Sequence, residues 1–367
     1  MKKLLILIIL IFILSSCQID LSNKKLFDVG IDYETEFYTW IVNNQLDNGL
    51  VKTTEDGQTI SLYDNALAAI VFTMKGDYDK ARKIFDFFDE RIESELNDQY
   101  GGFAQFRNSD GNFNGIGMRW LGDNAWLLIA INNYQMETNT QDYAYLELYL
   151  NLWIRGLQNS DGSLSSGVDE NGNKISPVTE GMIDAYNAIE GNDTFHKNLY
   201  EYLMSNRYDE IDDMFIAWPG NESYKYSLDI SSWGYLAFDD MPISMLTFAD
   251  QHFLMTRNNV TGYCADEDLD SIFTEHSLQM ATAYAAAGSN YYSNAESIIE
   301  NMNQLVIDSN MYDDAKGLPY VSNQATVYGS GLIWDGADTK IHLSGTAWYL
   351  MALYAYNPFE AGLKKDK

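Results

Sequence analysis

The hydrophobic pattern of the chain alternates between two kinds of predicted helix. The first kind has one apolar stripe at helical spacing and charged residues on its other side, as in the segments 81–92, 33–41 and 295–302. The stripe of the first of these segments consists of Ala81, Ile84, Phe85, Phe88 and Ile92. We expect these segments to be outer helices, with one face wet and one face buried.

The second kind of predicted helix is apolar on nearly all sides. The segment 66–74 reads ALAAIVFTM, and the segments 125–131, 280–287 and 347–355 have the same character. A helix that is apolar all round is buried all round, so these segments should be inner helices.

The two kinds alternate along the chain as six outer/inner pairs. The fourth pair is the least regular, because its inner segment 230–238 is short and contains Gly234. Links from an inner to the next outer helix are short, whereas links from outer to inner are long and rich in Gly, Asn and Asp. This asymmetry predicts a closed ring with one elaborated face, where binding and catalysis usually occur. The six pairs span 31–75, 78–136, 141–190, 194–238, 242–288 and 291–356.

Three loops of this pattern share a short motif. It reads LQNSDGS at 157–163, FRNSDG at 106–111 and, more loosely, QLDNGL at 45–50. With the six pairs, these loops resemble the (α/α)6 toroid of the six-hairpin glycosidase superfamily. The resemblance implies one all-α domain over 31–358, followed by a C-terminal tail over 359–367. Because the motif recurs in hydrolases, polysaccharide lyases, sugar epimerases and terpene cyclases, it specifies architecture better than activity.

The N-terminus carries an export signal. Two lysines precede an apolar run over 4–14, which is too short to cross a bilayer as a stable helix. The sequence Leu-Ser-Ser-Cys that ends at Cys17 resembles the lipobox of bacterial lipoproteins, which implies cleavage before Cys17 and acylation of that residue. We therefore predict a signal peptide over 1–16, a tether over 17–30 and a lipid anchor in the cell envelope. The alternative is an ordinary secretory signal that is cleaved near a cysteine.

Charge and cysteine content exclude several classes of partner. The formal net charge of −30 becomes more negative when Lys2 and Lys3 leave with the signal, which disfavours nucleic acid and anionic lipid. Acylation of Cys17 leaves only Cys264, so no intramolecular disulfide is expected. No cluster has zinc spacing, and 169–174 (DENGNK) lacks the calcium-loop pattern, so we expect no metal and no cofactor. We expect the domain to be a monomer.

Aromatic residues are abundant and make up 14% of the chain. Their rings suit a wet cleft in which sugars stack, although a Tyr-rich helical core would also explain the excess. The aromatic candidates for sugar binding in or beside the long loops are Tyr63, Trp120, Trp126, Trp218, Trp233 and Trp334.

Carboxylates recur where the inner helices begin. Asp64 in YDNA and Asp123 in GDNA occupy near copies 59 residues apart, and Glu180 and Glu275 both follow a threonine. By repeat position, all four should surround one mouth of the ring. The alternative is helix capping, because Asp is a good N-cap and a Thr cap with Glu in the first turn is favourable.

Paired carboxyl groups are what glycoside hydrolysis needs, one as acid and one as base or nucleophile. We therefore predict Asp64, Asp123, Glu180 and Glu275 as catalytic candidates. Asp184, one turn below Glu180, and His276, next to Glu275, join the aromatic residues as candidates for substrate binding.

Three functions remain open at this point. The first is an exported, lipid-anchored glycoside hydrolase with a carbohydrate substrate. The second is a non-catalytic glycan-binding lipoprotein or a partner in polysaccharide export. The third is a polysaccharide lyase or a sugar epimerase on the same scaffold, although the scarcity of Arg and the negative charge argue against an anionic substrate. Terpene cyclases are disfavoured, because no aspartate-rich metal motif is present and the chain is predicted to be exported.

Overall fold

The computed structural model describes residues 25–219, 225–326 and 333–364. The predicted signal peptide 1–16, Cys17 and most of the predicted tether lie outside these residues.

The outer helices of the described chain are α2 (Glu34–Asn43), α4 (Tyr78–Asp89), α6 (Ala144–Gly156), α8 (Thr194–Asn206), α10 (Ser244–His252) and α12 (Tyr292–Met302). The inner helices are α3 (Leu62–Met74), α5 (Leu121–Thr138), α7 (Thr179–Ala188), α9 (Leu228–Ala237), α11 (Thr274–Ala286) and α13 (Leu343–Leu353).

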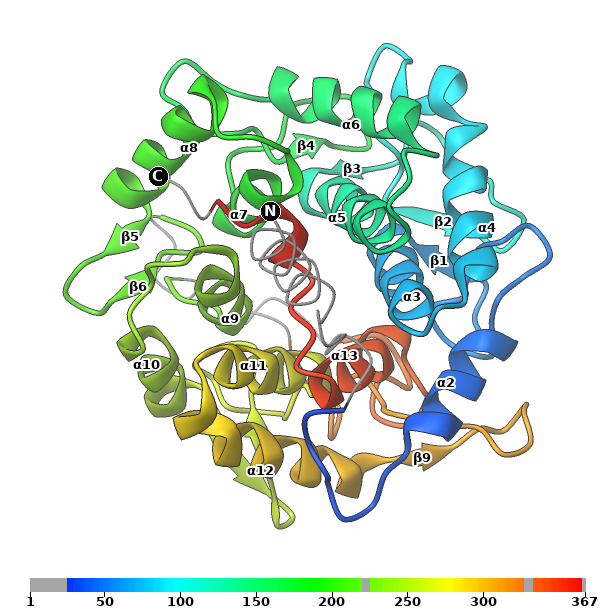
Figure 1. The fold of residues 1–367 in the computed structure, drawn as a ribbon, viewed down its shortest axis with the longest axis vertical. Coiled ribbons are helices and arrows are strands. Elements are labelled where there is room, and N and C mark those ends of the chain that lie inside the picture. Colours follow the sequence, from blue (N-terminus) through cyan, green and yellow to red (C-terminus); the bar gives the residue numbers. More distant parts are fainter. Residues whose placement is uncertain (1–24, 220–224, 327–332, 365–367) are drawn as a thin grey trace, which may run out of the picture.

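The inner helices form a closed ring, and the outer helices surround it (Figure 1). Each inner helix contacts the next one along the chain, and α13 contacts α3 to close the ring. Each of the six predicted pairs contains one outer and one inner helix. The all-α prediction of an (α/α)6 toroid is therefore confirmed.

Burial follows the hydrophobic pattern. On α4 the predicted stripe is buried and the opposite face is wet, whereas every residue of α13 is buried. Removing so much apolar surface from water is the main favourable term in forming the ring. Gly234, the irregular feature of the fourth pair, lies inside α9 where a Cβ atom would come within 2.9 Å of the Phe215 ring. The glycine therefore allows close packing and does not end the helix.

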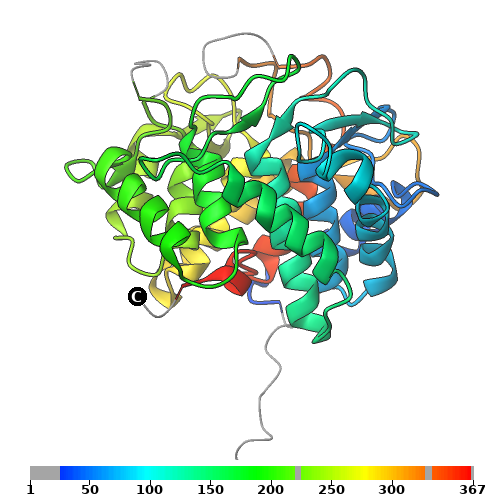
Figure 2. The ribbon, with the colours of Figure 1, turned by 90° about the horizontal axis from the view of Figure 1, so that it is seen from above.

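The long loops gather on one face of the ring and the short links on the other (Figure 2). Two antiparallel strand pairs join the loops of successive helix pairs: β1 (Thr59–Ser61) with β2 (Phe106–Asn108), and β3 (Arg119–Trp120) with β4 (Gly167–Val168). Three more antiparallel pairs each lie within one loop: β5 (Tyr208–Asp209) with β6 (Met214–Phe215), β7 (Leu254–Arg257) with β8 (Val260–Tyr263), and β9 (Ile307–Asp308) with β10 (Lys316–Gly317). The remaining short turns are the π-helical η1 (Ile92–Leu96) and the 3₁₀-helical η3 (Ser289–Tyr291), η4 (Asn303–Leu305) and η5 (Glu360–Gly362).

Two of the three loop motifs have the same structural role. The Gln45 side chain donates to the backbone oxygen of Lys80 in α4 at 3.0 Å, and Gln158 donates to the backbone oxygen of Phe195 in α8 at 3.0 Å. Each glutamine thus ties the end of one outer helix to the next outer helix. The segment 106–111 differs, because it forms β2 and the turn that follows.

Both ends of the described chain pack onto the face opposite the long loops (Figure 2). Phe27 and Val29, inside the predicted tether 17–30, are each only 2% exposed. Phe359, in the predicted tail 359–367, is fully buried, and its ring lies 5.2 Å from that of Trp126. The hydrophobic core therefore includes residues outside the predicted domain boundaries of 31 and 358. Within the described ranges, no helix combines the length and apolar character needed to cross a membrane.

Candidate active site

A cavity of about 820 Å³ opens among the long loops, above the first turns of the inner helices. The four predicted catalytic residues Asp64, Asp123, Glu180 and Glu275 all line it. They come from α3, α5, α7 and α11, so the ring brings together segments that are far apart in the sequence. The repeat position of these carboxylates therefore predicted their common location.

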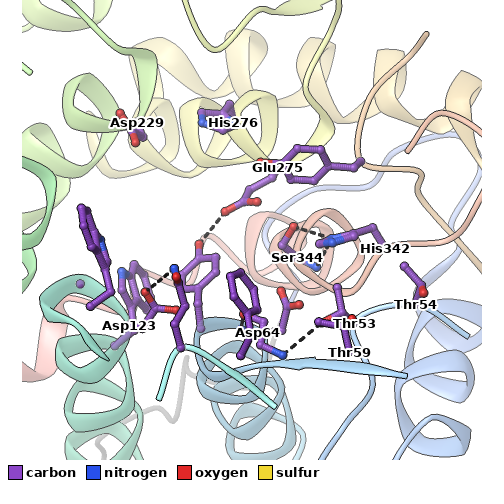
Figure 3. Close-up of a pocket in the computed structure, with 18 of the residues that line it drawn as sticks. Thr53, Thr54, Thr59, Asp64, Asp123, Asp229, Glu275, His276, His342 and Ser344 are labelled. Atoms are coloured by element: carbon purple, nitrogen blue, oxygen red, sulfur yellow. Dashed lines mark hydrogen bonds between the residues drawn. The ribbon is translucent and has the colours of Figure 1, made fainter. Parts of the chain in front are cut away.

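A fifth carboxylate, Asp229, also lines the cavity (Figure 3). It lies in the first turn of α9, the position that the other four occupy on their own helices. The sequence prediction missed it, although the repeat logic that found the others also applies to Asp229. Five successive inner helices thus each present one acidic residue to the same space. The sixth, α13, has no acidic residue in its first turn and begins beside His342 and Ser344.

Helix capping does not explain the two aspartates of the repeated motif. The N-cap of α3 is Ser61, whose hydroxyl oxygen accepts the Asp64 N–H at 3.2 Å. The N-cap of α5 is Trp120, which provides no side-chain cap. Asp64 and Asp123 lie inside the first turn, and their carboxyl groups face the cavity.

The threonines that precede the two glutamates are not caps either. Val178 and Phe273 occupy the N-cap positions of α7 and α11. The Thr179 hydroxyl donates to the Ile216 backbone oxygen at 2.5 Å, and the Thr274 hydroxyl donates to the Pro319 backbone oxygen at 2.6 Å. Both threonines therefore hold a neighbouring loop against the start of an inner helix.

The asparagines of the repeated Asp-Asn motif have a matched structural role. Asn65 accepts the Val51 N–H at 2.8 Å and donates to the Val51 oxygen at 3.0 Å. Asn124 accepts the Phe103 N–H at 2.8 Å and donates to the Phe103 oxygen at 3.1 Å. In each copy the asparagine holds the loop in place, and the preceding aspartate is left to line the cavity.

Glu275 is held by two hydrogen-bond donors. Tyr63 donates its hydroxyl to Glu275 Oε1 at 2.6 Å, and Gln279 Nε2 donates to the same oxygen at 3.0 Å. Trp348 Nε1 in turn donates to the Tyr63 oxygen at 3.0 Å, which orients the phenol. Burial and the Glu275 charge raise the pKa of Tyr63 well above its usual value, so Tyr63 remains a donor.

Asp64 and Asp123 are nearly covered, with exposures of 2% and 6%. Burial raises the pKa of Asp64 to about 8, and the charges of Glu275 and Asp123 add to the effect. Burial raises the pKa of Asp123 to about 7, against an opposing hydrogen bond from Gln105 Nε2 at 3.2 Å. Both groups therefore hold a proton well above the pH at which an exposed aspartate releases it.

Glu180 is less covered than these aspartates and has the longer side chain. Burial of its carboxyl group, followed by the charges of Asp229, Asp123 and Glu275, raises its pKa well above the usual value. Asp229 Oδ1 accepts the Ser227 hydroxyl at 2.5 Å and the Ile230 N–H at 2.7 Å. Glu180, whose protonated form is favoured by burial, therefore lies near Asp229, whose Oδ1 accepts two hydrogen bonds.

Asp184 does not line the cavity, so its predicted contact with substrate is wrong. It is fully buried beneath Glu180, close enough to α5 that a Cβ atom on Gly122 would lie 3.1 Å from its Oδ2. Burial and then the Glu180 charge raise the pKa of Asp184 well above its usual value. Asp184 therefore lies beneath the site in an environment that favours its neutral form.

The aromatic candidates occupy three different environments. Trp126 and Trp233 line the cavity but are only 1% and 3% exposed, and they pack with Tyr63 as its floor. Trp120 and Trp334 line more open positions, and Trp334 is 45% exposed. Trp218 is 43% exposed and does not line the cavity, so its role in substrate binding stays a prediction.

Two histidines complete the cavity wall. His276, as predicted from its position beside Glu275, lines the cavity, and its Nδ1 has no hydrogen-bond partner within the described chain. Burial lowers the pKa of His342 to about 3, so this imidazole is neutral, and its Nδ1 accepts the Ser344 N–H at 3.3 Å.

The sequence offered no signal for the residues of the cavity lining that come from loops, because these residues belong to no repeat or motif. They include Thr53, Gln105, Tyr320 and His342.

The carboxylates of the cavity are too dispersed to form a compact metal cluster. Within the described residues, the only group of three or more His, Cys, Asp or Glu residues whose ligand atoms lie within 4.8 Å of one another is Cys264, Asp268 and Asp270. These three do not line the cavity.

No family model matches the chain, and no curated protein matches it in sequence. Solved structures match its fold over most of its length. Cellobiose 2-epimerase from Bacillus thermoamylovorans matches with a TM-score of 0.65 and 12% identity, over 88% of this chain and 96% of its own. An α-amylase from Clostridium perfringens matches with a TM-score of 0.62 and 12% identity, over 89% and 97%. A glycosidase in complex with glucose matches with a TM-score of 0.62 and 11% identity, over 90% and 96%.

The chain therefore has the (α/α)6 toroid of the six-hairpin glycosidase-like fold. At these identities the likeness shows the fold, and the activity has to be argued from the site.

Proposed function

We propose that this protein is a glycoside hydrolase that cleaves an oligosaccharide or polysaccharide. The observation that carries the proposal is the set of five carboxyl groups, one from each of five successive inner helices, around one aromatic-lined cavity. Glycoside hydrolysis needs a protonated acid on one side of the bond and a carboxylate on the other. The cavity offers carboxyl groups whose pKa is raised by burial, such as Glu180, and a carboxyl group that accepts hydrogen bonds, Glu275.

Glu180 is the best candidate for the general acid. Burial and the neighbouring carboxylates raise its pKa well above the usual value, which favours the protonated form, and its side chain is less covered than those of Asp64 and Asp123. It can therefore reach a leaving-group oxygen in the cavity.

Glu275 is the best candidate for the base or nucleophile. Its Oε1 accepts hydrogen bonds from Tyr63 and Gln279, which fixes the orientation of the carboxylate. Its other oxygen is left to contact water or the sugar. Phe106, which is 54% exposed, and Trp334 offer ring faces on which sugars can stack.

The proposal is tested by incubating the purified protein with a panel of glycans and measuring new reducing ends. Loss of an acid or base typically costs about 10²–10⁴-fold in kcat, so Glu180→Gln and Glu275→Gln should each lower turnover by that factor. The matched control is Glu300→Gln, the same change at an exposed position on α12. Full activity in both cavity variants would refute these roles.

A second measurement separates the two roles. A substrate with an acidic phenol as leaving group needs little protonation, so Glu180→Gln should lose much less activity on it than on a natural glycan. Glu275→Gln should lose activity on both substrates. The reverse pattern would exchange the two assignments.

A sugar epimerase is the second candidate, and the observation that favours it is the pair of histidines in the cavity wall. An imidazole can remove a proton from the carbon next to a carbonyl group, and His276 Nδ1 is not engaged by any described residue. An epimerase would convert a reducing disaccharide to an isomer without releasing new reducing ends. Binding of a glycan with neither product would instead indicate a non-catalytic glycan-binding protein.

We further propose that the protein is an extracytoplasmic lipoprotein anchored through Cys17. The sequence that ends at Cys17 supports this, since a cleaved signal and an acylated cysteine keep a domain at a membrane without a spanning helix. Expression of the full chain with labelled palmitate should give a labelled membrane-bound protein. Cys17→Ser should abolish the label and Cys264→Ala should retain it. Labelled protein from Cys17→Ser would refute the anchor.

A further inference from the structure

The cavity holds more carboxyl groups than glycoside hydrolysis uses. Its described lining contains five carboxyl groups and no Lys or Arg. The proposed reaction uses two of the five, Glu180 and Glu275, so Asp64, Asp123 and Asp229 remain. A covered carboxyl group avoids the cost of its charge either by keeping a proton, as burial favours for Asp64 and Asp123, or by pairing with a positive group. The protein provides no such group in the described lining, so a ligand would have to supply it.

Two buried acceptors in the lining are also left without donors. Asp64 Oδ2 and Gln279 Oε1 have no hydrogen-bond partner among the described residues. Water cannot easily replace such a partner, because Asp64 is only 2% exposed and Gln279 is fully buried. Both residues line the cavity. Buried acceptors are normally satisfied, so these atoms call for a ligand that donates hydrogen bonds.

The spacing of the carboxylates argues against a metal ion as this ligand. A calcium ion draws six to eight oxygen atoms to about 2.3–2.6 Å. In the described chain, no three of the cavity's carboxyl residues bring one oxygen each within 4.8 Å of one another. The carboxyl groups are instead distributed around a space that is large enough for sugar rings.

We propose that the cavity recognises a cationic amino sugar, namely a glycan whose residues carry a free, protonated amine. This inference rests on the proposed role of the cavity as a glycan site. An ammonium group has three donors and no acceptor, which matches carboxylates that only accept. An acetylated amine has no charge to offer, and a uronate would bring a further carboxylate to a described lining that holds five carboxyl groups and no Lys or Arg.

The test is calorimetric titration of the purified protein with three hexasaccharides at a mildly acidic pH: glucosamine, N-acetylglucosamine and galacturonate. One partly covered charge pair is worth about a tenfold gain, so the glucosamine hexamer should bind about tenfold tighter than the acetylated one. Its binding should also release protons from the cavity carboxyl groups, seen as a heat that depends on the ionisation enthalpy of the buffer. Equal affinity for the acetylated hexamer, or preference for galacturonate, would overturn the inference.

Matched variants test which cavity carboxyl groups pair with the ammonium group of the amino sugar. Asp64→Asn should reduce the affinity ratio between the glucosamine and acetylated hexamers several-fold and reduce the proton release, and Asp229→Asn gives a second, independent test. Glu300→Gln, the exposed control on α12, should change neither quantity. An unchanged ratio in both cavity variants would overturn the inference.

The binding test of amino-sugar recognition and the cleavage test of the hydrolase can fail independently of each other. Tight binding of the glucosamine hexamer with no new reducing ends would support amino-sugar recognition and refute the hydrolase. Cleavage of neutral glycans without any preference for the amine would support the hydrolase and overturn amino-sugar recognition.

Discussion

Tyr63 donates its hydroxyl hydrogen to Glu275 Oε1 at 2.6 Å, although 212 residues separate them in the sequence. Tyr63 lies in the first turn of α3 and Glu275 in the first turn of α11. In the ring, α13 lies between these helices, and its Trp348 donates to the Tyr63 oxygen. Three inner helices therefore determine the orientation of one carboxylate.

This relationship predicts that Tyr63→Phe impairs turnover more than binding. Loss of the hydroxyl leaves Glu275 with a single donor, Gln279, so the carboxylate should be less well oriented. We expect kcat to fall by about tenfold or more, with a smaller change in KM. Steady-state kinetics on the cleaved glycan would measure both. Tyr145→Phe on α6, where the side chain is 63% exposed, is the matched control, and equal kinetics for the two variants would contradict the assignment.

The pKa of Asp64 predicts how stability depends on pH. Folding raises this pKa from 3.8 to about 8, so between these values the folded state keeps a proton that the unfolded chain has released. The contribution of Asp64 to stability is therefore fully present below about pH 4 and is lost as the pH rises through about 8. In urea unfolding, Asp64→Asn should become more stable relative to the native protein as the pH rises from 5 to about 9. If the free energies of unfolding of the two proteins changed with pH in parallel, the pKa of Asp64 would not be raised in the folded state.

The matched asparagines predict matched losses of stability. Asn65→Ala and Asn124→Ala each leave the N–H and oxygen of a buried loop residue, Val51 or Phe103, without their partners. Each change should lower the free energy of unfolding by about 2–3 kcal/mol. Urea midpoints measured at a fixed pH would show this. A large loss in only one of the two would mean that the repeated motif is not equivalent in the two units.

The buried ring of Phe359 predicts that the C-terminal segment stabilises the toroid. It contacts Trp126 and Trp233, whose rings form part of the cavity floor. Phe359→Ala should lower the free energy of unfolding by about 3–5 kcal/mol, the usual cost of emptying such a site.

The same substitution at Phe106, which is 54% exposed, should change the free energy of unfolding by only about 0.5 kcal/mol. A small effect at Phe359 would mean that the segment is dispensable for folding.

The repeat was readable from the sequence for a physical reason. A helix that is buried all round needs apolar residues on every side, and a helix with one wet face needs a single apolar stripe. The local hydrophobic pattern therefore predicts the order of the outer and inner helices.

The site could be predicted from the sequence only where its residues followed the repeat. Asp64 and Asp123 could be found because one Asp-Asn motif occurs twice, and Asp229 could have been found from its position alone. The structure buries Asp184 below the cavity and leaves Trp218 outside its lining, because a helical periodicity does not say where a cavity ends.

The chain by itself determined the two classes of helix, their alternation and the face on which long loops gather, since each depends on residues within a few turns of one another. The tertiary structure alone decided which acidic groups meet, which hold a proton and which accept hydrogen bonds. Those properties depend on burial and on charges contributed by segments far apart in sequence, and electrostatic interactions act through space and not along the chain.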